Sequence, residues 1–160
     1  MVRATLATIA QLDATIGAAL LDHPKAKLLA PLPRIGEVSL AQVIAEVGPL
    51  LDRCRTVEQA AAGCGVAPVT SESGKSRNVA FRHATNTRAR VALTCFADNA
   101  RHGSPWAGQL YKDAKARGAR HPHAVRIVSR AWLRVIWSCW TNNTVYDPEL
   151  HGAETRHAAA

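Results

Sequence analysis

The chain has 160 residues, of which 48% are hydrophobic, and a formal net charge of +8. This length is enough for one well-buried domain and too short for two large ones. The apolar content excludes a disordered basic tail. Because alanine is abundant while Phe and Tyr are scarce, we expect a mostly α, compact helical domain.

The positive charge is concentrated in one part of the chain. Residues 75–134 contain 13 Lys and Arg against two acids, a local net charge of +11. Residues 1–74 have six basic and seven acidic groups (net −1), and residues 135–160 have one and three (net −2), so the three parts sum to +8. A segregated basic segment of this kind attracts polyanions, above all nucleic acid.

Residues 3–22 are predicted to form a helix with one apolar stripe. The stripe consists of Leu6, Ile9, Leu12, Ile16 and Leu20, at three- and four-residue steps. It indicates either an amphipathic helix packed on its own domain or a short coiled coil between two chains, although Asp13 interrupts the seam. We expect residues 1–24 to be a connector helix. No uninterrupted apolar run of about 18 residues and no signal peptide is evident, so we expect no membrane span and a cytoplasmic location.

A tight turn around Pro33 and Gly36 precedes a second predicted helix, which Gly48-Pro49 is expected to end. A turn that leads into a helix N-terminus exposes backbone N–H groups that suit a phosphate. Arg34, Ile35 and Gly36 therefore resemble the second half of a helix-hairpin-helix, a module that holds the DNA backbone. Glycine usually stands where this chain has Arg34, and a plain helical packing unit is the equal alternative.

Residues 56–63 are predicted to form a short helix capped by Thr56. From Val66 to Phe81 no helical periodicity is present, and Pro, Thr, Ser, Gly and Asn predict a loop or a short extended piece. This segment contains the pair Ser73-Gly74, at the upstream border of the basic segment. Reactive groups are often found on such loops.

Three further helices are predicted, over residues 86–101, 106–116 and about 123–140, and residues 149–160 are expected to be a disordered tail. The last helix has Arg126, Arg130 and Arg134 in a stripe opposite its apolar face. Three arginines at this spacing without acidic partners repel one another, so an anionic partner is expected. The four cysteines form no Cys-x-x-Cys pair, and no metal site is expected in this chain.

Taken in order, several short motifs resemble the C-terminal domain of transposases of the insertion-sequence-110 family. They are Leu32-Pro33-x-Ile35-Gly36, Ala45-Glu46-Val47-Gly48, Gly65-Val66-Ala67-Pro68, Ser73-Gly74, Asn86-x-Arg88, His121-Pro122-His123, the helix ending at Trp140, and Tyr146-Asp147-Pro148. The match spans roughly residues 20–148, and we assign residues 25–148 to this domain. No single motif is specific, but their order and spacing are hard to obtain by chance.

The resemblance implies that Ser73 is a nucleophile that attacks a DNA phosphodiester and forms a phosphoserine–DNA intermediate. Ser71 and Ser76 are the rival serines. The resemblance and the local charge together suggest a set of DNA-binding residues: Arg34, Ile35, Gly36, Gly74, Lys75, Arg77, Arg82, Arg88, Arg126, Arg130 and Arg134. Phosphoryl transfer needs mainly positioning and neutralisation of the phosphate charge, which basic residues supply.

Relatives of this kind also have an N-terminal acidic domain that binds Mg²⁺, a structured guide-like RNA partner, and a multimeric full-length form. The acids of this chain are scattered singly, so we expect no cofactor here and a transposase fragment that needs the other half. Two alternatives stay open. The chain could be a non-catalytic helix-hairpin-helix module that binds nucleic acid, or an inactive transposase remnant.

Overall fold

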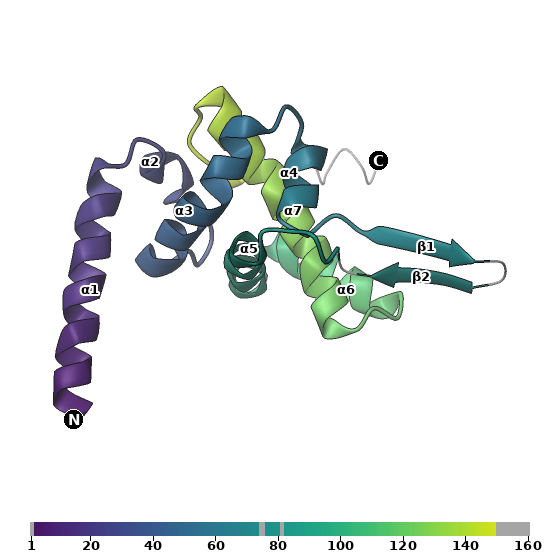
Figure 1. Cartoon of the computed structure of the whole chain (residues 1–160), viewed down its shortest axis with the longest axis horizontal. Coiled ribbons are helices and arrows are strands. Elements are labelled where there is room, and N and C mark those ends of the chain that lie inside the picture. The colour runs from purple at the N-terminus through teal and green to yellow at the C-terminus, as the bar shows by residue number, and fades with distance from the viewer. Residues whose placement is uncertain (1, 74–75, 81, 150–160) are drawn as a thin grey trace.

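The computed structural model describes residues 2–73, 76–80 and 82–149, and there the chain is mostly helical, as expected (Figure 1). The helices are α1 (Val2–Asp22), α2 (Ala26–Leu29), α3 (Glu37–Arg53), α4 (Val57–Gly63), α5 (Thr87–Ala100), α6 (Pro105–Ala116) and α7 (His121–Asn142). Two strands, β1 (Val69–Ser73) and β2 (Ser76–Ala80), lie between α4 and α5. The predicted fold class is therefore confirmed.

Capping side chains set the start of three helices. The Thr56 hydroxyl accepts from the backbone N–H of Gln59 at α4, and the Asn86 side chain accepts from the N–H groups of Arg88 and Ala89 at α5. Ser104 does the same at α6, where Pro105 follows in the first turn. Each cap supplies an acceptor to N–H groups that have no partner within the helix, which is why these boundaries were readable in the sequence.

The predicted end of α3 at Gly48-Pro49 is wrong, because the helix continues to Arg53. Proline removes one backbone hydrogen bond from a helix interior, but Leu50 and Leu51 behind it are 4% and 3% exposed, and their burial stabilises the last turn. Gly48 has a packing role instead of a capping role. A Cβ atom at this position would lie 2.8 Å from the Trp140 ring.

The core lies where α3, α5, α6 and α7 pack together. Trp132 of α7 is fully buried at its centre and makes edge contacts with Phe96, Trp106 and Tyr146 at ring-centroid distances of 5.4, 5.1 and 5.8 Å. Tyr146 belongs to the segment after α7. The backbone N–H of Tyr146 donates to the Leu28 carbonyl of α2 at 2.9 Å. These contacts make α7 the helix against which most of the chain is arranged (Figure 1).

The segment after α4 is a β-hairpin, which corrects the looser expectation of a loop or a short extended piece. β1 and β2 pair antiparallel, with Val69 opposite Ala80 and Ser73 opposite Ser76. The hairpin projects from the helical body like an arm (Figure 1). Its base is closed where the Asn86 N–H donates to the Gly63 carbonyl at 2.9 Å, and Gly65 has a φ of 68° beside Thr85.

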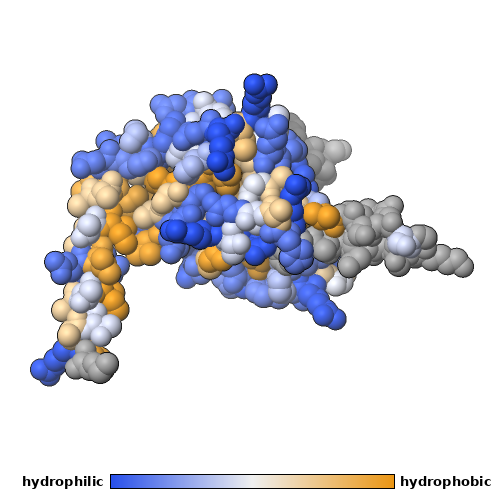
Figure 2. All heavy atoms as spheres, in the orientation of Figure 1, coloured by the Kyte–Doolittle hydropathy of each residue, from blue (hydrophilic) through white to orange (hydrophobic). Residues whose placement is uncertain are grey.

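Helix α1 projects from the body on the side away from the hairpin (Figure 1). None of its residues is buried, and Leu6, Ile9 and Leu12 are 48% to 59% exposed, so an apolar stripe faces solvent along the helix (Figure 2). By length and composition this helix could cross a membrane, so the expectation that no segment qualifies was too strict. One such helix near an N-terminus does not by itself indicate a membrane span, since core helices of soluble proteins and signal sequences have the same length and apolar composition.

The predicted division into residues 1–24, 25–148 and 149–160 stays a prediction. Helix α1 does project from the part that contains the core (Figure 1), but α1 also contacts α3. The expected tail falls almost entirely on residues 150–160, outside the described residues.

Candidate nucleic-acid interface

Ser73 is the last residue of β1, near the far end of the hairpin arm, and it is exposed. Gly74 and Lys75, which were expected to accompany it at a phosphate, lie outside the described residues. Arg77 falls on β2, and Arg82 follows β2 and is exposed. The rival serines, Ser71 and Ser76, lie on β1 and β2. The hairpin therefore holds the exposed Ser73 hydroxyl away from the helical body (Figure 1).

A groove of about 290 Å³ lies at the base of this arm, between α7 and the segment that leads into β1. One wall is Val66 and Pro68; the other is the face of α7 that contains the predicted arginine stripe. The residues of α7 in the groove are His123, Arg126, Ile127, Arg130, Ala131 and Arg134. Among the described residues the lining thus has three guanidinium groups and no carboxylate, which gives the groove a positive potential.

The three arginines differ in depth, which the sequence did not predict. Arg126 is 4% exposed, Arg130 is half-buried and Arg134 is exposed. Four residues advance a helix by slightly more than one turn, so an i, i+4, i+8 stripe rotates around the axis. Val66 and Pro68 line the groove beside this stripe, and Arg126, the N-terminal arginine of the three, is buried.

Burial changes the protonation equilibria at this deeper end. Desolvation lowers the pKa of the Arg126 guanidinium. Desolvation, and then the charge of Arg126, lower the pKa of His123. Both shifts mean that positive charge is held at a cost in this groove, and a bound anion would reduce that cost.

Two of the predicted arginines have acidic partners. Arg134 lies 3.7 Å from Glu58 of α4, so the expectation of a stripe without acidic partners is wrong at this position. Arg88, in the first turn of α5, lies 2.6 Å from Glu46 of α3, although its side chain is 83% exposed. Exposed ion pairs contribute about 0 to 1 kcal/mol each, so either arginine can exchange its partner for a phosphate.

The predicted helix-hairpin-helix residues lie on the turn between α2 and α3, away from the groove lining. Arg34 has a φ of 55°, the left-handed conformation that glycine adopts easily, which explains why glycine is usual here. Its aliphatic stem packs on Gly103 in the turn between α5 and α6. Ile35 is half-buried, and Gly36 caps α3 without a side-chain acceptor. The unit has the expected order of helix, turn and helix, and its identity as a helix-hairpin-helix remains a prediction.

Sequence reasoning missed the second wall of the groove, the His123 side chain in its lining, and Glu58, which pairs with Arg134. His123 precedes Arg126 by three residues on one helix face, and this spacing is a local signal that could have indicated it. Glu58 and the Val66–Pro68 wall come from the part of the chain with no net positive charge. No local pattern indicates that they meet α7, because the tertiary fold brings them there.

Comparison with known proteins agrees with the motif order. A protein-family model described as "Transposase IS116/IS110/IS902 family" matches residues 26–112, more than half of the chain. The mini-circle putative transposase for IS117 of Streptomyces coelicolor is 28% identical over 97% of this chain and 40% of its own length. An uncharacterized 42 kDa protein of insertion element IS900 from Mycobacterium paratuberculosis is 26% identical over 88% and 35%.

A third relative, an uncharacterized 43.6 kDa protein of insertion element IS110 from Streptomyces coelicolor, is 27% identical over 87% of this chain and 34% of its own length. The chain therefore spans roughly a third to two fifths of the relatives that it matches. The family-model match covers more than half of the chain and leads to one conclusion. The chain belongs to the IS116/IS110/IS902 transposase family.

Proposed function

We propose that this chain is the DNA-binding part of a transposase and that Ser73 attacks a DNA phosphodiester during transposition. One observation supports this best: an exposed serine on a projecting arm whose base opens into a groove with three arginines and no carboxylate. The groove would hold the backbone of the DNA, and the arm would present the hydroxyl to it. The family membership supports DNA as the substrate class.

In the proposed step the Ser73 Oγ–P bond forms while one P–O bond of the phosphodiester breaks. The hydroxyl proton goes to a base, and the leaving oxygen takes up a proton to become a DNA hydroxyl end. Exposed arginines, among them Arg82 and Arg88, would neutralise charge on the non-bridging oxygens. The Oγ–P ester then conserves the phosphodiester energy for attack by a second DNA hydroxyl, which regenerates the serine.

A serine hydroxyl is weakly nucleophilic until a base or metal activates it. In the part of the chain that the structure describes, no group of three His, Cys, Asp or Glu side chains could hold a metal ion. We therefore derive no step through Mg²⁺ from these residues. The base and any metal would come from the remainder of a full-length relative, together with the structured RNA and the multimeric state that the resemblance implies.

The alternative proposal is a binding module without catalysis, and the same geometry supports its binding half. Helix α3 begins at Gly36 with no side-chain cap, and a Cβ at Gly36 would meet nothing within 4 Å. Its first N–H groups are therefore open to a phosphate, as in a helix-hairpin-helix. Arg34, on the preceding turn, adds a cation.

Two variants and one control separate these proposals. Arg130→Ala should weaken duplex DNA binding and lower the salt dependence by about one phosphate contact, whereas Arg3→Ala on α1 makes the same charge change away from the groove and should have little effect. Ser73→Ala should bind DNA normally but form no covalent adduct when the rest of a full-length relative is supplied. An adduct that persists in Ser73→Ala would exclude Ser73, and no adduct with wild type would leave the binding module as the function.

A further inference from the structure

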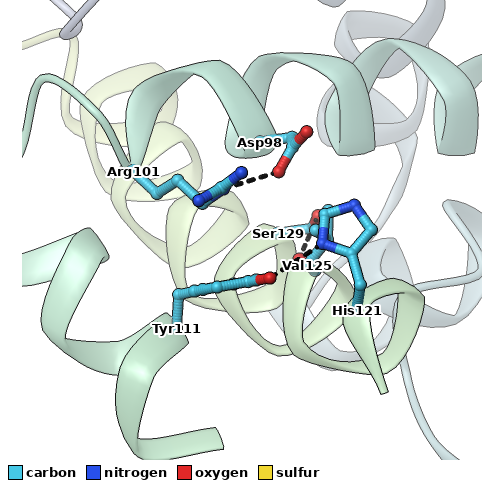
Figure 3. Close-up of polar contacts among 6 residues, drawn as sticks. All are labelled: Asp98, Arg101, Tyr111, His121, Val125 and Ser129. Atoms are coloured by element: carbon cyan, nitrogen blue, oxygen red, sulfur yellow. Dashed lines mark hydrogen bonds and ion pairs between the residues drawn. The ribbon is translucent and has the colours of Figure 1, made fainter. Parts of the chain in front are cut away.

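A chain of contacts between side chains joins α5, α6 and the start of α7 (Figure 3). It consists of Asp98, Arg101, Tyr111 and His121. The Arg101 Nε donates to the Asp98 Oδ1 at 2.6 Å, and the guanidinium lies 4.3 Å from the centre of the Tyr111 ring. The Tyr111 hydroxyl lies 2.9 Å from the His121 Nδ1. Each contact limits the next side chain, so the Asp98 carboxylate is held in one place on a basic surface.

Beside this carboxylate lies a hollow of about 310 Å³ between α5 and the first turns of α7. Val91, Pro122 and Val125 give it apolar walls, and Val91 is 53% exposed although it is a large apolar side chain. Thr94 and Asp98 supply polar groups on successive turns of α5, and His121 lies at the rim. The hollow is separate from the arginine groove, with which it shares no lining residue.

Three side chains of α5 bring hydrogen-bonding groups to the hollow: the Arg90 guanidinium is a donor, and Thr94 and Asp98 offer acceptors. The Thr94 hydroxyl already donates to the Arg90 carbonyl at 2.8 Å, so its lone pairs are what it offers a ligand. The Asp98 carboxylate accepts from Arg101 through Oδ1, and within the described residues no further hydrogen bond or ion pair to it is present. A ligand that bonds to Thr94 and Asp98 must bring N–H donors, and the Arg90 guanidinium could bond to an acceptor such as a carbonyl oxygen of the same ligand.

The surrounding charge selects among donor-rich ligands. The hollow lies within the segment of net charge +11, which disfavours a cationic ligand such as an ammonium group. The Asp98 carboxylate disfavours an anionic group on the edge of the ligand that meets Asp98. A neutral, planar group with N–H donors on one edge and apolar faces satisfies both limits, and the imidazole of His121 is a surface on which such a ring can stack.

From these observations we infer that the hollow binds one unpaired nucleobase and prefers guanine. Guanine has adjacent N–H donors on its Watson–Crick edge, which match the acceptors Asp98 and Thr94, and single-stranded bases are read by such edge contacts with stacking. The phosphates on either side of the base would be attracted by the basic surface. This inference rests on the proposed nucleic-acid binding and adds a base-reading site to it.

The test measures binding of the whole chain to single-stranded oligonucleotides by fluorescence anisotropy. A polythymidine DNA containing one guanine is compared with the same strand containing inosine, which lacks the 2-amino group, or adenine; a matched polyuridine series with ribose asks whether DNA or RNA is preferred. Wild type should bind the guanine strand roughly tenfold more tightly than the inosine and adenine strands in at least one series.

Asp98→Asn should abolish this preference, and Thr94→Val should reduce it. Asp113→Asn is the matched control, because Asp113 is the other acid of the basic segment, bonds to Gln109, and does not line the hollow. Both Asn variants remove one negative charge, so a gain in affinity that they share is electrostatic. Loss of guanine preference in Asp98→Asn but not in Asp113→Asn supports the base-binding site. Thermal melting by circular dichroism shows whether each variant is folded. If Asp98→Asn does not fold, the guanine preference of Thr94→Val is the deciding measurement.

Equal binding of guanine, inosine and adenine strands by wild type would overturn the inference. An unchanged guanine preference in Asp98→Asn would also overturn it. If only Thr94→Val folds, an unchanged guanine preference in that variant would do the same. Base-blind binding that weakens with salt would do so while leaving the proposed DNA binding intact. Absence of binding to every strand and to duplex DNA would instead overturn the proposed function.

Discussion

If the arginine groove binds DNA as proposed, Glu58 competes with the DNA for Arg134, and Glu58→Gln should raise the affinity of this chain for DNA. The carboxylate lies 3.7 Å from the guanidinium, and the two side chains are 61% and 59% exposed. Removing the carboxylate charge frees Arg134 for a phosphate and makes the groove more positive. If the arginine groove binds the DNA backbone, its affinity must respond to this change.

The size of the effect follows from the geometry. Two unit charges at this distance in water interact by about 1 kcal/mol, and exposed ion pairs contribute about 0 to 1 kcal/mol after the cost of ordering both side chains. The affinity should therefore rise by a factor of up to about five at low salt. At an ionic strength near 0.15 M the Debye length is about 8 Å, so the gain should shrink as salt is added.

The assay is fluorescence anisotropy with a labelled DNA duplex at several salt concentrations. Asp13→Asn makes the same charge change on α1 and serves as the control for the overall charge of the chain. Glu58→Gln should exceed this control at low salt and approach it at high salt. Equal affinities of the two variants at low salt, or weaker binding by Glu58→Gln, would refute the assignment of Arg134 to the binding groove.

Three further predictions concern packing and protonation. Gly48→Ala should lower the free energy of unfolding by about 1–2 kcal/mol, because a Cβ only 2.8 Å from the buried Trp140 ring forces a shift that outweighs the helix propensity of alanine; chemical denaturation measures it. Cys95 is exposed, while burial raises the pKa of Cys64 to about 12, so a thiol reagent at about pH 8 should modify Cys95 first and Cys64 only after unfolding, as mass spectrometry of digests would show. The pKa of His123 is lower in the folded chain, so the unfolded chain binds the proton first as the pH falls, and stability should drop between about pH 7 and 5; His123→Gln should remove part of this drop in thermal melts.

Local signals were enough to predict most helices. Thr56, Asn86 and the apolar face of α7 lie in short windows of sequence where capping and periodicity act on near neighbours. Pro49 shows where local reasoning ends: proline disfavours a helix interior, but burial of Leu50 and Leu51 against the core stabilises the next turn. The β-hairpin was missed as such because strand pairing joins residues that are up to 11 positions apart, with polar side chains that carry little alternation.

The site shows the same division. The sequence indicated the arginine stripe, since i, i+4 spacing places residues on one helix face. It could not indicate that Arg126 is buried, because Val66 and Pro68 come from a distant part of the chain. It also could not indicate the contacts that hold Asp98, which depend on three helices meeting.

The basic segment is therefore not a binding site by itself. Its arginines on α7 become a groove only because the residues that lead into β1 form a second wall, and those residues come from the half of the chain with a net charge of −1. Gly65, at a φ of 68° against Thr85, and the hydrogen bond from Asn86 to Gly63 fix this wall to the start of α5. The same closure sets the base of the arm that presents Ser73. A side chain at Gly65 would strain the turn and meet Thr85 at 2.9 Å, so the wall and the arm should be displaced together. Such a variant should therefore impair the proposed phosphate binding and the proposed placement of Ser73 at the same time.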